Sequence, residues 1–411
     1  MPVDTGDTAF ILASAALVML MTPALGFFYG GLVRRKNVLS IIMRCLVSLA
    51  IVSIIWVLWG YSLAFGPDRL GLIGGPEWLG FAGVGAAPSL TYAATVPHEA
   101  YAIFQLMFAA ITPALITGAF ADRMKFRSYV AFLLIWSTLV YVPVAHWVWG
   151  AGGWLHKLGA LDFAGGTVVH VNAGVAALAA ALVIGKRKGF GRDPMLPHNI
   201  TYVVIGTTLL WFGWFGFNAG SALSSGAVAA NAFLATQLGA SAAAVSWLSL
   251  DWLTKGRPSV VGTCTGAVAG LVAITPASGF VDPPAAIAIG AGAAVVCYLA
   301  VLLKARSGLD DALDVWGVHG VGGTFGALMT GVFATTLVNP NGGNGLIHGN
   351  PSQLGVQAIA VGVVWLYTFV LTFLILKLLD RTLRLRVDEK EEALGLDVAQ
   401  HGEEAYAEVM S

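Results

Sequence analysis

Charged residues are scarce in this sequence. Asp, Glu, Lys and Arg together make up 11% of its 411 residues, whereas hydrophobic residues make up 57%. A soluble domain needs a more polar surface, so the composition indicates a helical membrane protein that crosses the bilayer many times. The formal net charge is zero, which in a membrane protein says nothing about nucleic-acid or acidic partners. We expect a protein of this class to have no nucleic-acid partner. The positions of the charges are therefore more informative than their sum.

Cysteines and catalytic motifs are also scarce. Cys45, Cys264 and Cys297 lie inside apolar runs without a short pairing motif, so we expect buried thiols rather than a disulfide framework or a metal site. No cofactor-binding motif or nucleophile elbow is present, so we expect no cofactor and no enzyme activity. The first apolar run lacks a basic leader and is too long for a signal-peptide core, which favours a retained first span.

Long apolar runs fill most of the chain, separated by charged or Gly/Pro-rich breaks. Because helices or closed barrels alone satisfy the backbone in lipid, and these runs are too long for barrel strands, an α-helical bundle is predicted. The eleven predicted spans are 8–32, 39–64, 98–121, 128–149, 163–185, 197–219, 226–253, 259–276, 284–304, 312–336 and 353–380.

Lys and Arg fall mainly on one side of an eleven-span arrangement. The opposite side keeps only Arg69 and Lys157. We expect the protein in the inner or plasma membrane. By the positive-inside rule, its N-terminus is expected outside the cell and its C-terminus in the cytoplasm. The basic clusters are Arg34-Arg35-Lys36, Arg123/Lys125/Arg127, Lys186-Arg187-Lys188/Arg192, Lys255/Arg257, Lys304/Arg306 and Arg381/Arg384/Arg386.

Eleven spans divide into two inverted five-helix repeats, spans 1–5 and 6–10, plus one further helix. A carboxylate precedes a histidine by eight residues in each half, as Asp162 and His170 and again as Asp311 and His319. Eight residues of helix would place each pair on one face, about 12 Å apart along the axis. Inverted repeats bring equivalent residues together at the membrane midplane, so we expect the two histidines to face each other.

The last span and the tail have separate roles in this scheme. Residues 354–379 form a run of 26 mostly apolar residues, which as a helix measures about 39 Å against a hydrocarbon core of about 30 Å, so it should lie tilted across the outside of the bundle. The transport domain is thus expected to span residues 1–380. Residues 381–411 form a polar tail, interpreted as a regulatory docking surface or lid, with a disordered end as the alternative.

The histidines suggest a transport path, because an ionisable residue in a span is costly and usually functional. Aromatic residues at the outer ends of spans suit a small cation, although an ordinary interfacial aromatic belt is the alternative. A cation site followed by an apolar path with imidazoles favours a substrate that is charged in water and neutral after losing a proton. Ammonium fits this description, and Na⁺ and K⁺ do not.

Several segments carry a family resemblance that runs from span 1 into the tail. The chain resembles the ammonium transporter (Amt/Mep/Rh) family, in its prokaryotic Amt branch. The matching segments are Phe28-Tyr29-Gly30-Gly31-Leu32, Ile103-Phe104-Gln105, Gly118-Ala119-Phe120-Ala121-Asp122-Arg123, Asp162-Phe163-Ala164-Gly165-Gly166-Thr167-Val168-Val169-His170, Gly213-Trp214-Phe215-Gly216-Phe217-Asn218-Ala219-Gly220-Ser221, Gly317-Val318-His319-Gly320, Gly395-Leu396-Asp397 and His401-Gly402-Glu403.

The resemblance implies roles for individual residues. It implies an external ammonium site at Phe108, Trp149 and Ser221, with Phe108 and Phe217 as the stacked gate below it. It also implies twin pore histidines, a carboxylate that shapes the external site, and further wall positions. The twin histidines are His170 and His319, and the carboxylate is Asp162. The further wall positions are Trp214, Tyr29 and Val315.

The resemblance further implies a homotrimer in the lipid bilayer, one pore per subunit, methylammonium as a substrate analogue and a cytoplasmic PII-type signalling protein as partner. Two alternatives stay open: an ammonium sensor or receptor, and a neutral-gas channel for ammonia or CO2. The short tail disfavours the sensor, since such sensors usually carry a signalling domain. Trp149 disfavours a gas channel, which would be expected to lack the aromatic cation site.

The remaining membrane carboxylates have simpler structural interpretations. Asp162 is also expected to cap the N-terminus of span 5, a role compatible with the electrostatic one. Asp311 and Asp314 are expected to cap span 10 or to pair with Lys or Arg. Asp251 is interpreted as an interface anchor beside Lys255.

Overall fold

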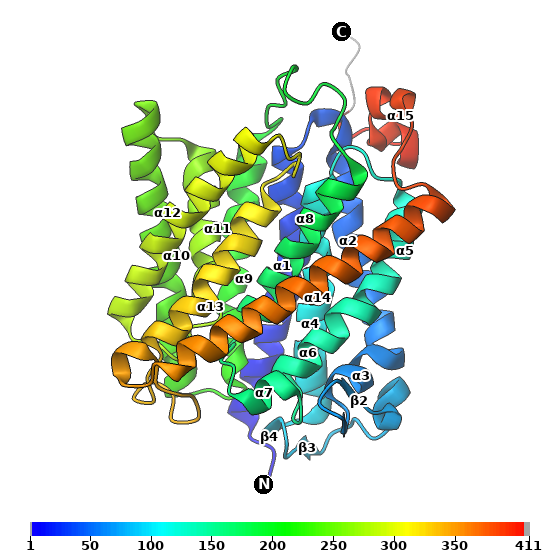
Figure 1. The fold of residues 1–411 in the computed structure, drawn as a ribbon. Helices are drawn as coiled ribbons and strands as arrows, with labels where there is room; N and C mark the ends of the chain where they lie inside the picture. Colours follow the sequence, from blue (N-terminus) through cyan, green and yellow to red (C-terminus); the bar gives the residue numbers. More distant parts are fainter. Residues whose placement is uncertain (1, 407–411) are drawn as a thin grey trace.

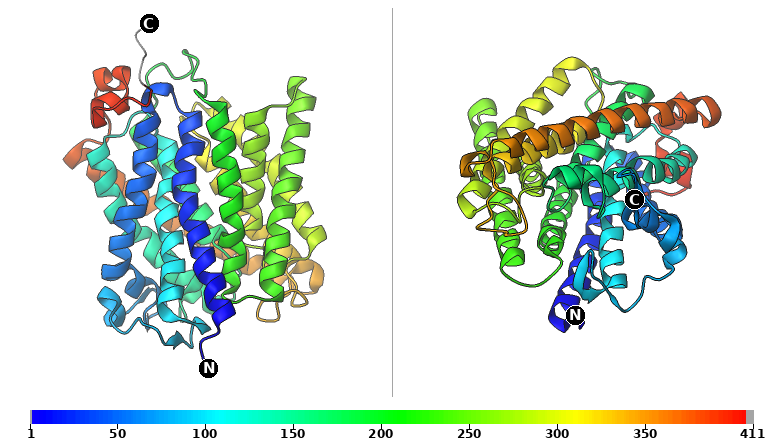
Figure 2. Two further views of the ribbon diagram at one scale, coloured as in Figure 1. Left: turned by 180° about the vertical axis from the view of Figure 1, so that it is seen from behind. Right: turned by 60° about the horizontal axis from the view of Figure 1, so that its bottom comes forward.

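The computed structural model describes residues 2–406 and shows an all-helical bundle of long, roughly antiparallel helices (Figures 1 and 2). Each of the eleven predicted segments contains a helix. The α-helices are α1 (Thr5–Leu32), α2 (Val38–Ile55), α3 (Tyr61–Phe65), α4 (His98–Ile116), α5 (Phe126–Trp136), α6 (Val142–Trp149), α7 (Trp154–Leu158), α8 (Asn172–Ile184), α9 (Ile200–Ala219), α10 (Ala227–Lys255), α11 (Val260–Ile274), α12 (Pro283–Ser307), α13 (Val321–Phe333), α14 (Ser352–Leu383) and α15 (Glu389–Leu394).

Nine helices in residues 2–406 are long and apolar enough to cross a membrane by length and composition. Two of them contain a pair of α-helices joined by a π-helical turn: Trp56–Gly60 joins α2 to α3, and Ser137–Tyr141 joins α5 to α6. Spans 8 and 10 are shorter than predicted. The first is the 15-residue helix α11, and the second combines a π-helical turn with the 13 residues of α13.

Helix α1 begins at one end of the bundle, and helix α15 of the tail lies at the other (Figure 1). We call these ends the N-side end and the tail-side end. The N-side loop between α3 and α4 contains two short antiparallel hairpins that sequence periodicity did not predict. Their strands are β1 (Asp68–Arg69) paired with β2 (Ile73–Gly74), and β3 (Pro88–Ser89) paired with β4 (Ala93–Pro97).

Helix α14 crosses the outside of the bundle diagonally, as its length predicts (Figure 1, orange). Two buried hydrogen bonds join it to different helices. The Trp136 indole of α5 donates to Thr372 Oγ1 over 2.9 Å, and Thr368 Oγ1 donates to Asn172 Oδ1 of α8 over 2.8 Å. Burial of polar partners favours pairing, so α14 is held in one position across these helices.

The tail packs against the tail-side end through residue 406. The Asp397 carboxylate accepts hydrogen bonds from the backbone N–H groups of Leu39 and Ser40, at the start of α2. Glu392, which is 2% exposed, accepts from the Lys188 backbone and from Arg386. The alternative of a disordered tail therefore does not hold for residues 381–406, while residues 407–411 lie outside the described residues.

A buried ionic cluster lies beneath the tail. Asp310 accepts three hydrogen bonds from the Arg187 side chain, at 2.8–3.1 Å, and one from the Arg187 backbone at 2.7 Å. Arg187 also lies 3.6 Å from Asp122, which pairs with Arg34 at 2.8 Å. The cluster joins four separate loops, so it fixes the tail-side ends of the helices relative to each other.

We expect Asp310→Ala to lower the free energy of unfolding by about 3 kcal/mol, because it leaves the buried Arg187 without its main partner. Burial raises the pKa of Asp310, but the Arg187 hydrogen bonds and the Arg123 charge outweigh it and hold this pKa below its ordinary value. The stabilisation is therefore present above about pH 4 and is lost as the pH falls through the lowered pKa. Thermal unfolding in detergent should show a constant difference from wild type between pH 8 and 5, which shrinks below pH 4.

The matched control is Asp193→Ala, since Asp193 is exposed in the loop after α8 and should change stability by about 0.5 kcal/mol or less. Equal stability losses in the two variants, or a difference that grows on acidification, would contradict a buried ion pair at Asp310.

Candidate functional site

The two histidines lie face to face in the middle of the bundle. Their Nδ1 atoms are 3.2 Å apart, and their ring centroids are 5.3 Å apart with the planes at 24°. His170 is 2% exposed and His319 is 4% exposed. The juxtaposition expected from their equivalent positions in the two halves is therefore confirmed.

Both histidines lie in π-helical turns that open their helices. His170 belongs to the turn Gly166–Val171 before α8, and His319 to the turn Trp316–Gly320 before α13. The aspartates precede these turns, so the prediction that each aspartate and histidine share a helix face about 12 Å apart was wrong. The sequence spacing is equal in both halves because each aspartate binds the start of the turn that carries the histidine.

Asp162 is a complete helix cap. Its carboxylate accepts hydrogen bonds from the backbone N–H groups of Gly165, Gly166, Thr167 and Val168 at 2.7–3.0 Å. Together these contacts satisfy donors that a helix start leaves unpaired. The predicted cap is confirmed.

The other membrane carboxylates also have structural partners. Asp311 Oδ2 accepts from the Trp316 backbone N–H at 2.7 Å, and Asp314 pairs with Lys304 at 2.6 Å, so the predicted cap and ion pair in span 10 are both present. Asp251 lies 2.5 Å from Lys255. The contacts agree with the structural interpretations of Asp311 and Asp314, and Asp251 stays interpreted as an interface anchor beside Lys255.

Glycines allow the two histidine-bearing segments to touch. A Cβ atom added to Gly174 would collide with the backbone of Gly320, and one added to Gly323 would lie 3.0 Å from His170 Cβ. Small residues let helix backbones approach closely in membranes. The glycines beside each histidine thus account for the short distance between the rings.

An aromatic column leads from the N-side end to the histidines. The Phe108 and Phe217 rings are 4.4 Å apart between centroids, and both residues are almost fully buried. Below them, the His170 ring stacks on Trp214 at 5.3 Å and on Phe217 at 6.0 Å. The phenylalanine pair therefore closes the column at this level, between two cavities.

The N-side cavity, of about 240 Å³, lies above the phenylalanine pair. The structure brings the three predicted site residues Phe108, Trp149 and Ser221 together in its wall. Ser221 Oγ donates to Phe217 O at 2.9 Å, which leaves its oxygen free to accept. The other lining residues were not assigned a role from the sequence: Thr91, Tyr92, Tyr101, Gln105, His156, Phe163 and Leu223.

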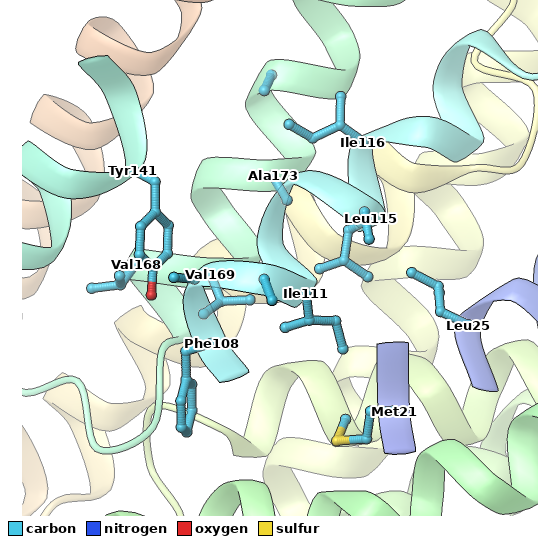
Figure 3. Close-up of a cluster of buried hydrophobic side chains, with 14 of the residues drawn as sticks. Met21, Leu25, Phe108, Ile111, Leu115, Ile116, Tyr141, Val168, Val169 and Ala173 are labelled. Carbon is cyan, nitrogen blue, oxygen red and sulfur yellow. The ribbon is translucent and has the colours of Figure 1, made fainter. Parts of the chain in front are cut away.

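The central cavity has a volume of about 10 Å³, room for about one water-sized molecule. Its polar side chains are His170, His319 and Trp214, and the Trp214 N–H donates to Thr275 at 2.8 Å. The rest of the wall is aliphatic and aromatic, and Figure 3 shows part of this apolar surface. The remaining lining residues are Met21, Leu25, Phe28, Ile111, Leu115, Val169, Leu210, Phe217 and Val268.

The tail-side cavity, of about 220 Å³, contains His319 and Tyr29 in its wall. His319, Phe28 and Val268 line both this cavity and the central one, so the two cavities share part of their wall. The Tyr29 hydroxyl donates to Leu115 O at 3.0 Å. Val315 is 1% exposed and does not line any of the three cavities; it lies behind the wall, close to Gly118.

Asp162 does not line the N-side cavity. It is connected to this cavity through its backbone oxygen, which accepts from the Trp149 indole N–H at 2.9 Å. The helix cap and the position of the tryptophan thus depend on one residue.

All three cysteines are buried and free. Within residues 2–406, no group of three or more His, Cys, Asp or Glu side chains is arranged to hold a metal ion.

Comparisons with known proteins give one family. The model of the Ammonium Transporter Family matches residues 9–406. An ammonium transporter of Bacillus subtilis is 51% identical over 98% of this chain and 99% of its own length. The crystal structure of Saccharomyces cerevisiae Mep2 superimposes with a TM-score of 0.91 at 39% identity, covering 100% of this chain and 93% of that one.

A structure described as a sensor Amt protein is also similar, with a TM-score of 0.87, 32% identity, and coverage of 96% of this chain and 98% of that one. Its identity to this chain is lower than that of the transporter relatives. The match to the family model over nearly the whole chain and the high identity to named transporters lead to one conclusion: this chain belongs to the ammonium transporter family, a family of transporters rather than enzymes.

Proposed function

We propose that this protein transports ammonium across a membrane by binding the cation in the N-side cavity and passing ammonia along the histidine path. The observation that carries this proposal is the order of three sites along one column of the structure. An aromatic cavity is followed by the Phe108/Phe217 contact and then by a narrow apolar cavity containing the two histidines.

The N-side cavity suits a small cation. Trp149 and Phe108 offer ring faces, whose quadrupole attracts positive charge, and their ring centroids are 5.7 Å apart. The Ser221 oxygen can accept one N–H of ammonium. Methylammonium keeps the charge and most of these N–H bonds, so we propose it as an analogue.

The central cavity suits a neutral molecule. An unpaired cation there would lose its hydration with little compensation, whereas ammonia can donate to one imidazole nitrogen and accept from another. Ammonium therefore gives one proton to water on the N side, and ammonia takes one up from water on the tail side. The proposal includes separate proton translocation: the released proton crosses by its own route, so each transported ammonium moves one net charge and produces a current. In this scheme Phe108 and Phe217 form the gate, and Tyr29, Trp214 and Val315 form or support the wall.

Asp162 acts in this proposal through its fixed position. Its oxygens are occupied by four backbone N–H groups, so it does not bind the substrate directly. Its charge favours a cation in the N-side cavity through the field, and its backbone oxygen orients Trp149.

The proposal includes orientation and assembly. Basic residues gather at the tail-side end, so we place this end in the cytoplasm and the N-terminus outside, in the plasma or inner membrane. Residues 1–380 would form the transport domain of a homotrimer with one pore per subunit. Residues 381–411 would form a regulatory tail, with a cytoplasmic PII-type protein as its partner.

Two alternative functions predict different measurements. A sensor would bind ammonium without appreciable flux, and the similarity to a sensor Amt protein supports keeping this candidate. A neutral-gas channel would carry ammonia or CO2 without current. The aromatic cation site favours the transporter over the gas channel.

The proposal is tested by an ammonium jump on purified protein in a solid-supported membrane, with internal pH followed in liposomes. We expect a saturable current. Trp149→Leu should raise the half-saturating ammonium concentration about tenfold, because losing a cation–π contact of about 1.4 kcal/mol changes affinity by that factor. Trp252→Leu is the matched control, since Trp252 is exposed far along α10.

Each other outcome selects a different function. Ammonia flux without current would identify a gas channel, and ammonium binding with neither signal would identify a sensor. An unchanged half-saturating concentration in Trp149→Leu would remove the N-side cavity as the recruitment site.

A further inference from the structure

Gln105 has a buried amide that the transport mechanism has not yet used. It lines the N-side cavity, is 8% exposed, and its Oε1 atom has no hydrogen-bond donor among residues 2–406. Buried polar atoms are nearly always paired, and an unpaired acceptor costs free energy. An amide oxygen left free beside a cavity is available to accept a hydrogen bond from a molecule in that cavity.

The position of Gln105 on its helix places it within the cation site. Tyr101, Gln105 and Phe108 are spaced four and three residues apart on α4, so they share one helix face. All three line the N-side cavity together with Trp149 and Ser221, which come from other segments. Gln105 thus lies one turn from the ring that forms the floor of this cavity.

Ammonium needs the kind of acceptor that Gln105 provides. Its N–H bonds point to the corners of a tetrahedron, and the two aromatic rings and the Ser221 oxygen leave at least one of them without a partner. A glutamine carbonyl is a strong, uncharged acceptor. The terminal amide torsion is broad, so the oxygen can turn toward a bound cation.

We propose that Gln105 is a further ligand of ammonium in the N-side cavity, with its amide oxygen accepting one N–H bond. This inference rests on the proposed transport function. The neutral amide also has a consequence for the next step. A carboxylate at this position would stabilise the cation relative to ammonia and oppose the loss of the proton, whereas an amide binds without that penalty.

The test compares ammonium-jump currents of three variants with wild type. Gln105→Leu removes the acceptor at similar volume and should raise the half-saturating concentration about tenfold, with the maximal current changed less than twofold. Gln105→Glu should lower both the half-saturating concentration and the maximal current. Gln237→Leu makes the same change on α10, where Gln237 contacts Ser241 and does not line the cavity, and should match wild type.

The opposite shifts in the Leu and Glu variants distinguish a ligand from a packing residue, which would lower the maximal current in both. If the Leu variant fails to fold, the Glu variant alone decides through the sign of its shift. An unchanged half-saturating concentration in the folded Gln105 variants would overturn the inference while wild-type current still supports transport. Absence of current in wild type would instead reject the proposed function.

Discussion

Asp162→Ala should largely prevent accumulation of folded protein. The substitution leaves the backbone N–H groups of Gly165 through Val168 without their acceptor in a buried position. Each unpaired buried group costs about 1 kcal/mol or more, so the total is about 4 kcal/mol or more. This approaches the whole stability of many proteins, about 5–15 kcal/mol. The yield of monodisperse protein and its unfolding temperature in detergent measure the effect.

Two further variants define the cause. Asp162→Asn keeps one strong acceptor oxygen and should fold with an intermediate unfolding temperature. Asp282→Ala removes a simpler cap at the start of α12, where the Asp282 carboxylate accepts one hydrogen bond from the Ala285 backbone N–H. It should lower the free energy of unfolding by about 1 kcal/mol. If Asp162→Ala were no less stable than Asp282→Ala, the cap would not be what holds the His170 turn.

His170→Ala should reduce the maximal ammonium current at least about 30-fold while leaving the half-saturating concentration near that of wild type. The central cavity would lose one of its two imidazoles, and ammonia would cross part of an apolar path without a hydrogen-bond partner. A desolvation cost of about 2 kcal/mol raises the barrier by that factor. Binding is unaffected because the recruitment site lies above Phe108 and Phe217, in another cavity.

His348→Ala is the matched control, since His348 is exposed in the loop before α14, and it should transport as wild type does. A variant at His170 that shifts only the half-saturating concentration would mean that the histidine acts in recruitment. A wild-type current in His170→Ala would show that the substrate takes another path.

The helices could be predicted from the sequence because each apolar run contains its own signal. The same holds for the pairing of the histidines, since the equal spacing of Asp162 to His170 and Asp311 to His319 marks equivalent places in two halves. The position of each aspartate relative to its helix could not be predicted. Each helix opens with a π-helical turn that begins after the aspartate. Hydropathy does not distinguish a π-helical turn from an α-helical one.

The composition of the N-side cavity was only partly predictable. Phe108, Trp149 and Ser221 were assigned through family resemblance, and their convergence required the fold. Tyr92 was missed because it lies in a loop whose hairpins depend on contacts with α3 and with the turn after α6. Its hydroxyl donates to Phe65 O and accepts from Ala151 N. Such long-range contacts leave no periodic pattern. Gln105 lies in a segment that carries the family resemblance, but the sequence assigned it no role.

The diagonal helix α14 affects the order in which the helices can pack during synthesis. Its hydrogen bonds to Trp136 and Asn172 come from residues 372 and 368, near the end of the chain. During synthesis, helices α5 and α8 are therefore made and inserted about 200 residues before their partners exist. Until then, Asn172 Oδ1 lacks its donor Thr368 and needs another partner, such as water or lipid. Packing around α14 can therefore be completed only after this last span has been synthesised and inserted. Chains truncated before residue 368 should remain incompletely packed.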